Sequence, residues 1–204
     1  MSKFLGPVHA KMYERILYQE KMIKAMIDLA SQKGWVTDLH NKINQEAPEA
    51  LDERLENIID QSNIHGWLGQ AVEASEKRFA RAVYEILRED PRRIGELKKV
   101  IKMLGREYVL PAGLNAEETY RAIYDILLDG MPCDFPFDVT EQSADVIKWR
   151  VRNCPHEKYW TDPDLGADVY YSLRDSWIEG VLENYGILYS HTATSEYCLR
   201  KERK

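Results

Sequence analysis

The sequence has few cysteines, glycines and prolines, and each shortage excludes a class of protein. Among 204 residues there are only 3 cysteines, 11 glycines and 8 prolines. An odd cysteine count without the spacing of a small secreted domain favours reduced thiols over a disulfide framework. Few glycines and prolines, with 44% hydrophobic and 30% charged residues, exclude a collagen-like, low-complexity or disordered chain. We therefore expect a folded protein in a reducing, cytoplasmic compartment.

Long hydrophobic runs and concentrations of positive charge are also missing. No apolar stretch approaches the roughly 20 residues that a membrane-spanning helix needs, and the first residues lack the apolar run of a signal peptide. The 28 Lys and Arg are outnumbered by 34 Asp and Glu, and no segment gathers the cations into a surface for nucleic acid. We expect neither a membrane nor a nucleic acid as a partner, and a small-molecule ligand instead.

Hydrophobic residues recur at helical spacing through the first two-thirds of the chain. Asn63 is placed to cap one helix, and Asn115 with Glu118 resembles a capping box at the start of another. The helices predicted from this pattern cover residues 7–30, a segment from about 37, a segment from about 48, 63–86, 97–105 and 115–128.

After Gly130 the pattern alternates as in β-strands. Strands are predicted near residues 135–141, 145–153 and 193–200, with a helix over 162–184 between the last two. The fold class is therefore α+β, with an amino-terminal helical bundle over 1–130 followed by a small antiparallel sheet with one covering helix over 131–204. We expect residues 1–204 to form a single domain in which the two parts share one core.

Two histidines and a glutamate lie on or beside the apolar faces of the predicted helices. His9 and Glu20 share the inward stripe of the first helix, although nearly three turns separate them. An ionised Glu20 inside the protein needs a partner, because a buried charge is costly. His65 lies at the start of the helix over 63–86, where a neutral ring could act as a donor, a base or a metal ligand. Either these residues line a common pocket, or each has only a structural role at the edge of the core.

Cationic side chains follow one face of the second predicted strand. Arg150, Arg152 and Cys154 share that face by the two-residue alternation of a strand. Cys198 lies on the polar face of the last strand. If the two polar faces coincide, thiols and guanidinium groups border the same space, and the alternative is a solvated sheet face with incidental cysteines.

Cys154 is the strongest candidate for chemistry. Nearby cations favour the thiolate, which is the form that attacks a substrate or binds a metal ion. His156, two residues further on, could serve as a base or a second ligand. Cys133 opens the first strand and should lie near Cys154 across the hairpin.

The order of elements at the carboxy-terminal end offers a further indication. A strand runs into Cys154-Pro155, a helix follows over 170–180, and the last strand carries Cys198. Over roughly residues 130–200 this order resembles the aminothiazoline-carboxylate hydrolase family. Members of that family often place further cysteines near the start of the helix, where this sequence has Tyr170 and Tyr171. At the other end, Phe4-Leu5-Gly6-Pro7 before His9 is similar to proteins of anaerobic bacteria.

Two functions from different classes follow from these residues. The first is a hydrolase that opens a carboxylated heterocycle or cleaves a related C–N bond. Arg150 or Arg152 would hold the substrate carboxylate, and Cys154 would attack or bind a divalent metal, while His156 or His65 moves the proton. Three further residues would complete the substrate site: Cys198, His9 and Glu20. The second function is a non-catalytic module that binds a small ligand, a cofactor or a metal ion.

Overall fold

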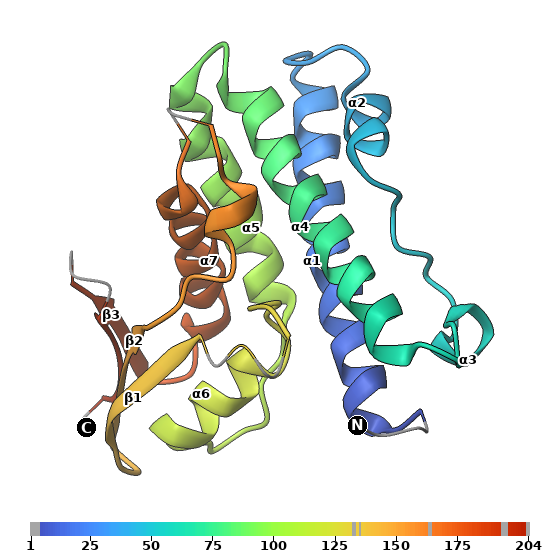
Figure 1. The fold of residues 1–204 in the computed structure, drawn as a ribbon. Helices are drawn as coiled ribbons and strands as arrows, with labels where there is room; N and C mark the ends of the chain where they lie inside the picture. Colours follow the sequence, from blue (N-terminus) through green and yellow to red (C-terminus); the bar gives the residue numbers. More distant parts are fainter. Residues whose placement is uncertain (1–4, 132–133, 135, 163–164, 193–195, 203–204) are drawn as a thin grey trace. The chain divides into compact units, whose positions relative to one another are not determined.

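The computed structural model describes residues 5–131, 134, 136–162, 165–192 and 196–202 (Figure 1). The chain divides into two compact units. The first unit comprises Met1–Ile94 and Asp125–Met131, and the second comprises Gly95–Tyr124 and Pro132–Lys204. Helices precede a four-stranded antiparallel sheet, so the α+β class is confirmed. The prediction of one shared core stays a prediction.

The first unit is built on two long helices, α1 (Pro7–Gln32) and α4 (Ile64–Leu87), which lie side by side. Both agree with the sequence pattern. Pro7 occupies the first turn of α1, where its missing N–H removes no helical hydrogen bond. Asn63 caps α4, and its Oδ1 accepts a hydrogen bond from the Gly66 N–H at 3.1 Å. The shorter elements of this unit are α2 (Leu39–Glu46), α3 (Leu55–Ile58) and η1 (Pro91–Arg93).

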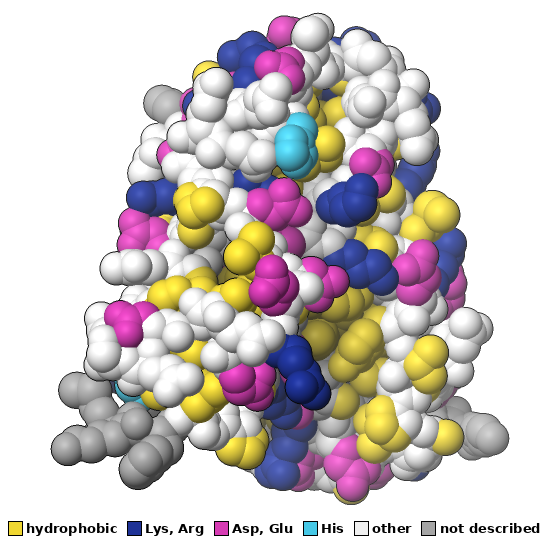
Figure 2. Space-filling model, turned by 90° about the vertical axis from the view of Figure 1, so that its right-hand side faces the viewer, with side chains coloured by type: hydrophobic (Ala, Val, Ile, Leu, Met, Phe, Trp, Pro, Cys, Tyr) yellow, Lys and Arg dark blue, Asp and Glu magenta, His cyan; other side chains and the backbone are white. Residues whose placement is uncertain are grey.

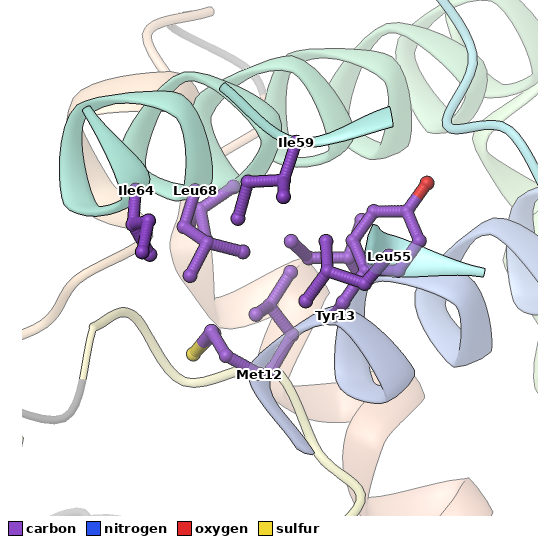
Figure 3. Close-up of a cluster of buried hydrophobic side chains, with 9 residues drawn as sticks. Met12, Tyr13, Leu55, Ile59, Ile64 and Leu68 are labelled. Carbon is purple, nitrogen blue, oxygen red and sulfur yellow. The ribbon is translucent and has the colours of Figure 1, made fainter. Parts of the chain in front are cut away.

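A hydrophobic cluster joins the amino-terminal halves of α1 and α4 (Figure 3). Its members come from both helices, from α3 and from the returning segment Asp125–Met131, which supplies Leu128. Burial of these side chains stabilises the unit. Six of them are Met12, Tyr13, Leu55, Ile59, Ile64 and Leu68.

The helix predicted from about Pro48 is wrong in extent, because only the turn Leu55–Ile58 is helical. Residues 48–54 instead run as an irregular segment that contacts the two long helices. The Leu51 carbonyl accepts a hydrogen bond from the Tyr13 hydroxyl at 2.5 Å, while the Leu51 side chain is 56% exposed. These tertiary contacts outweigh the weak helical pattern of the segment.

The second unit contains α5 (Ile94–Glu107), α6 (Ala116–Tyr124), α7 (Ala167–Leu182) and the sheet. The strands are β1 (Phe137–Gln142), β2 (Val146–Val151), β3 (Ile187–His191) and β4 (Glu196–Lys201), in the order β1-β2-β4-β3. Trp149 of β2 and Tyr197 of β4 are paired in register and stack at 5.6 Å between ring centroids. The indole N–H of Trp149 donates to the Tyr124 hydroxyl at 3.0 Å, which fixes α6 on the same face.

Strand β3 was not predicted. The turn before it ends at Gly186, whose φ of +63° is the left-handed conformation that glycine adopts most easily. The helix before that turn is shorter than predicted, because Asp162 forms an isolated bridge with Leu165 and α7 starts only at Ala167. The alternation of Ile187 and Tyr189 is typical of a strand, but the segment is too short for this pattern to be distinguished from the end of a helix.

Two glycines allow α5 and α7 to approach backbone to backbone. Gly105 does not end its helix as predicted, since α5 continues to Glu107. A Cβ at Gly105 would lie 2.2 Å from the Trp177 carbonyl oxygen, and one at Gly180 would lie 2.1 Å from the Lys102 carbonyl oxygen. Both positions therefore require glycine for packing.

Within the described residues, no helix combines the length and the apolar character required to cross a membrane.

Candidate functional site

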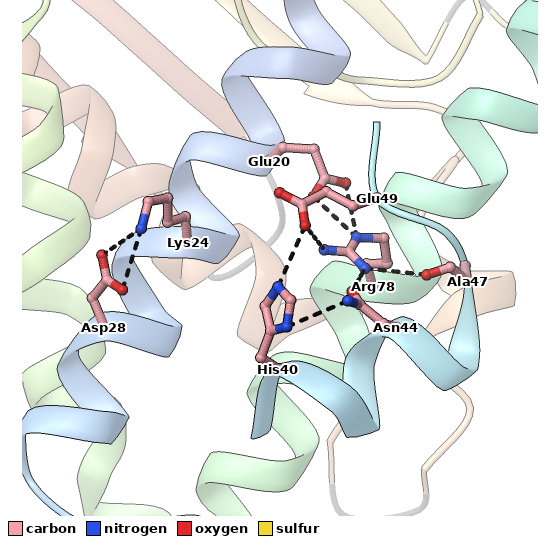
Figure 4. Close-up of polar contacts among 8 residues, drawn as sticks. All are labelled: Glu20, Lys24, Asp28, His40, Asn44, Ala47, Glu49 and Arg78. Atoms are coloured by element: carbon pink, nitrogen blue, oxygen red, sulfur yellow. Dashed lines mark hydrogen bonds and ion pairs between the residues drawn. The ribbon is translucent and has the colours of Figure 1, made fainter. Parts of the chain in front are cut away.

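A buried guanidinium group organises the polar interior of the first unit (Figure 4). Arg78 of α4 is 1% exposed, and its Nε donates to both carboxylate oxygens of Glu20 on α1, at 3.2 and 3.0 Å. Its Nη1 donates to Asn44 Oδ1 at 2.5 Å and to the Ala47 carbonyl oxygen at 3.1 Å. Glu20 therefore has the partner that its burial requires, and the partner is an ion rather than a backbone group.

A second carboxylate, from Glu49, approaches the same guanidinium. Its Oε2 lies 3.6 Å from Arg78 Nη2 and 3.4 Å from His40 Nε2. Burial raises the pKa of Glu20 above its ordinary value, and the charge of Arg78 opposes this, while the nearby Glu49 raises it further. Because Glu20 and Glu49 share one guanidinium group, this part of the first unit offers several carboxylate oxygens as hydrogen-bond acceptors.

A cavity of about 330 Å³ lies beside this ion cluster, and Glu49 belongs to both. Its aromatic part is a pair of rings, Tyr13 of α1 and Trp67 of α4, with centroids 5.6 Å apart. Small residues of α4, Ala71 and Ala74, leave space between the helix and the irregular segment. The apolar lining includes Tyr13, Leu51, Ile58, Trp67, Ala71 and Ala74.

Carboxylate charges act on the Tyr13 hydroxyl in this cavity. The pKa of Tyr13 is raised first by burial and then by the charges of Asp52, Glu20 and Glu53, while its hydrogen bond to Leu51 lowers it. Among the described residues that line the cavity there is no Lys, Arg or His. The arrangement can hold an apolar group against the two aromatic rings and a positively charged or donor group near Glu49.

Figure 2 shows the side of the molecule where α2 and α3 are drawn in Figure 1. Hydrophobic side chains are exposed there between acidic and basic ones. A hydrophobic ligand could therefore meet apolar surface on this side.

His9 and His65, which the sequence places on or beside the apolar faces of their helices, lie against each other. Their ring centroids are 5.1 Å apart in an edge-to-face arrangement. His9 is buried and its Nδ1 accepts the Gly6 N–H at 3.0 Å, whereas His65 is exposed. The two rings are in contact, while a common pocket and a role for the pair in binding or proton transfer stay predictions.

In the second unit, Cys154 and His156 both contact Tyr171 of α7. The Tyr171 hydroxyl donates to Cys154 Sγ at 3.3 Å, and the His156 ring meets the Tyr171 ring edge-on at 5.7 Å. His156 is fully buried and stacks on Tyr170 at 3.6 Å between ring centroids. Tyr170 and Tyr171, which stand where the aminothiazoline-carboxylate hydrolases often have cysteines, therefore contact the two candidate catalytic residues.

The two arginines proposed for carboxylate binding are paired within the sheet. Arg150 Nη2 lies 3.4 Å and Arg152 Nη1 3.7 Å from the Asp138 carboxylate of β1. Cys198 faces Lys148 in the register of β2 and β4, so the polar faces of these strands do coincide. A substrate carboxylate would have to compete with Asp138 for the guanidinium groups. Cys133 lies outside the described residues.

Arg78, Glu49 and the aromatic pair of the cavity were not predicted from the sequence. Arg78 carried a usable signal, because it stands three residues after Ser75 and four before Ala82 on the inward stripe of α4. A cation on such a stripe calls for a buried carboxylate, which Glu20 supplies. In the described part of the chain, no group of three or more His, Cys, Asp and Glu residues is placed to hold a metal ion.

No family model, no curated protein and no solved structure matches this chain significantly, so the resemblance to the aminothiazoline-carboxylate hydrolases stays a prediction.

Proposed function

We propose that the first unit is a binding module for a small hydrophobic organic cation, such as an aromatic or aliphatic amine. The observation that carries this proposal is the cavity of about 330 Å³ that has aromatic and alanine walls and a carboxylate, Glu49, at its edge. Ligand pockets in proteins start at roughly this volume and combine a mostly apolar lining with a few polar groups.

The chemistry of the walls favours a cation over other ligands. The faces of Tyr13 and Trp67 attract an ammonium group through their quadrupoles. Glu49 offers a carboxylate oxygen, and its partner Arg78 already binds Glu20 through Nε, so the arginine is not available to attract an anion. A carboxylated ligand would meet repulsion from Glu49 at this place.

A matched series of probes tests the proposal by isothermal titration calorimetry. The series is 3-phenylpropylamine, 3-phenylpropanol and 3-phenylpropionate, which share the apolar body and differ in charge. We expect the amine to bind most tightly and the carboxylate most weakly. In Glu49→Gln the preference for the amine over the alcohol should fall about fivefold, because a partly exposed ion pair contributes about 1 kcal/mol.

A second variant locates the binding. Ala71→Leu adds three carbon atoms to the cavity wall and should weaken all three probes, whereas Ala112→Leu, at an exposed position of the second unit, should change none of them. Tighter binding of the carboxylate than of the amine, or full binding by Ala71→Leu, would overturn the proposal.

Hydrolysis at Cys154 is the second candidate function. It is favoured by the contact between the Cys154 sulfur and the Tyr171 hydroxyl, since a donor at the sulfur stabilises the nucleophilic thiolate.

A further inference from the structure

A groove of about 360 Å³ in the second unit lies between α5 and α7, beside His191 at the carboxy-terminal end of β3. Three lysines of α5 line it, together with two serines and two carboxylates of α7 and His191 of β3. This groove belongs to neither candidate function described above.

The groove lies where a regular series of ion pairs is interrupted. Lys102 Nζ binds Glu179 Oε2 at 3.1 Å, and Arg106 Nε binds Glu183 Oε2 at 2.5 Å. Both pairs join residues that are 77 positions apart in the sequence. The offset stays the same because α5 and α7 run parallel, and moving from the first pair to the second advances about one turn along each helix. The same offset one turn earlier joins Lys98 to Asp175.

Asp175 does not bind Lys98, because β3 competes for it. Its Oδ1 accepts the Tyr189 hydroxyl at 2.7 Å, its Oδ2 lies 3.5 Å from His191 Nε2, and the adjacent Arg174 donates to it at 3.3 Å. Within the described residues, Lys98 consequently makes no ion pair, although it lines the groove.

Charge balance leaves the groove positive. Lys102 is neutralised by Glu179, Lys99 by Glu96 at 2.7 Å and Asp175 by Arg174, so the ammonium group of Lys98 is the uncompensated charge. An anion is therefore the complementary ligand.

The serines indicate what the rest of such a ligand carries. Ser172 Oγ donates to the Val169 carbonyl oxygen and Ser176 Oγ to the Ser172 carbonyl oxygen, both at 2.9 Å. With their hydrogens engaged, these oxygens can only accept, so they suit the hydroxyl groups of a ligand.

We infer that this groove binds a small phosphate monoester with a hydroxylated body, with Lys98 at the phosphate and the serine oxygens at the hydroxyls. Phosphate is favoured over carboxylate because lysine acts as a point charge and offers no planar fork for a carboxylate, and because a dianion gains more from a lysine with no counter-ion.

Calorimetric titration with glycerol 3-phosphate, glycerate and glycerol at constant ionic strength tests the inference. We expect glycerol 3-phosphate to bind more tightly than glycerate, and glycerol not to bind. Lys98→Gln should weaken glycerol 3-phosphate about fivefold or more. Lys24→Gln removes the same charge from the first unit, where Lys24 pairs with Asp28, and should leave binding unchanged.

Equal weakening by Lys98→Gln and Lys24→Gln would show a non-specific charge effect and overturn the inference. So would unchanged binding in Lys98→Gln, glycerate binding as tightly as glycerol 3-phosphate, or no saturable binding in the millimolar range. Thermal unfolding of each variant checks that the fold is retained. Because Ala71→Leu alters only the first unit, it should leave this binding intact, which separates the outcome from that of the proposed function.

Discussion

Burial raises the pKa of Glu20 more than the ion pair with Arg78 lowers it. Because its pKa is raised in the folded protein, the folded state binds the proton more tightly than the unfolded state does. The stability that this proton contributes is fully present below the ordinary pKa of 4.5 and is lost as pH rises through the raised pKa. Urea unfolding of the wild type and Glu20→Gln across this range should therefore show the wild type losing stability relative to the variant.

Asp90 supplies a control of opposite sign. Hydrogen bonds from the Arg92 side chain and backbone lower the pKa of this exposed carboxyl. The wild type should therefore lose stability relative to Asp90→Asn as pH falls through that lowered pKa. If the wild type instead gains stability relative to Glu20→Gln as pH rises above 4.5, Glu20 behaves as an ordinary ion-paired carboxylate and the prediction is wrong.

The reactivity of the Cys154 thiol tests the hydrolase hypothesis. We expect iodoacetamide to alkylate Cys154 faster than Cys133 at neutral pH, and Tyr171→Phe to slow the reaction by removing the donor at 3.3 Å from the sulfur. Mass spectrometry of timed samples measures each cysteine separately. Should Cys154 be the slowest thiol, and Cys154→Ala keep any ring-opening activity, the hypothesis is wrong.

At the scale of elements, the contact between α5 and α7 depends on glycine. Gly105→Ala places a Cβ 2.2 Å from a backbone oxygen that cannot move without shifting α7, and should destabilise the second unit by about 1–3 kcal/mol or more. Gly95→Ala, in the same helix with nothing within 4 Å of the added carbon, should be neutral or slightly stabilising. Thermal unfolding compares the two, and equal midpoints would contradict the packing argument.

The elements that could be predicted were those whose pattern repeats over several turns. The stripes of α1 and α4 and the alternation in β2 depend only on which side of an element is buried, and they agree with the structure. The turn α3 and the strand β3 are short, so neighbouring segments decide their conformation. A local pattern holds too little information for them.

The candidate site could be predicted only in part, for a related reason. Glu20 was found because it interrupts an apolar stripe. The cavity depends on where Glu49 and Leu51 pass over α4, and no periodicity encodes the path of an irregular segment. The packing of His156 against Tyr170 likewise joins parts of the chain that are separated in sequence.

At the scale of the whole molecule, the first unit depends on a segment far along the chain. Leu128 is buried in the hydrophobic cluster of α1 and α4, although residues 88–127 separate it from the end of α4. Leu128→Ala should destabilise this unit by about 2–5 kcal/mol. Hydrogen exchange followed by mass spectrometry should speed up in α1 and α4 peptides and stay unchanged in β2 peptides, and Leu188→Ala, at an exposed position, should change neither.

The division into two units determines what proteolysis or truncation can separate. The chain passes from one unit to the other at 94–95, 124–125 and 131–132, so three covalent connections join them. A protease that cuts any one connection leaves the units attached by the other two. A fragment ending at residue 94 lacks Leu128, and a fragment ending at residue 131 keeps the whole first unit but carries residues 95–124 of the second with it. A truncation or gene fusion with a single junction therefore cannot isolate the first unit from the second.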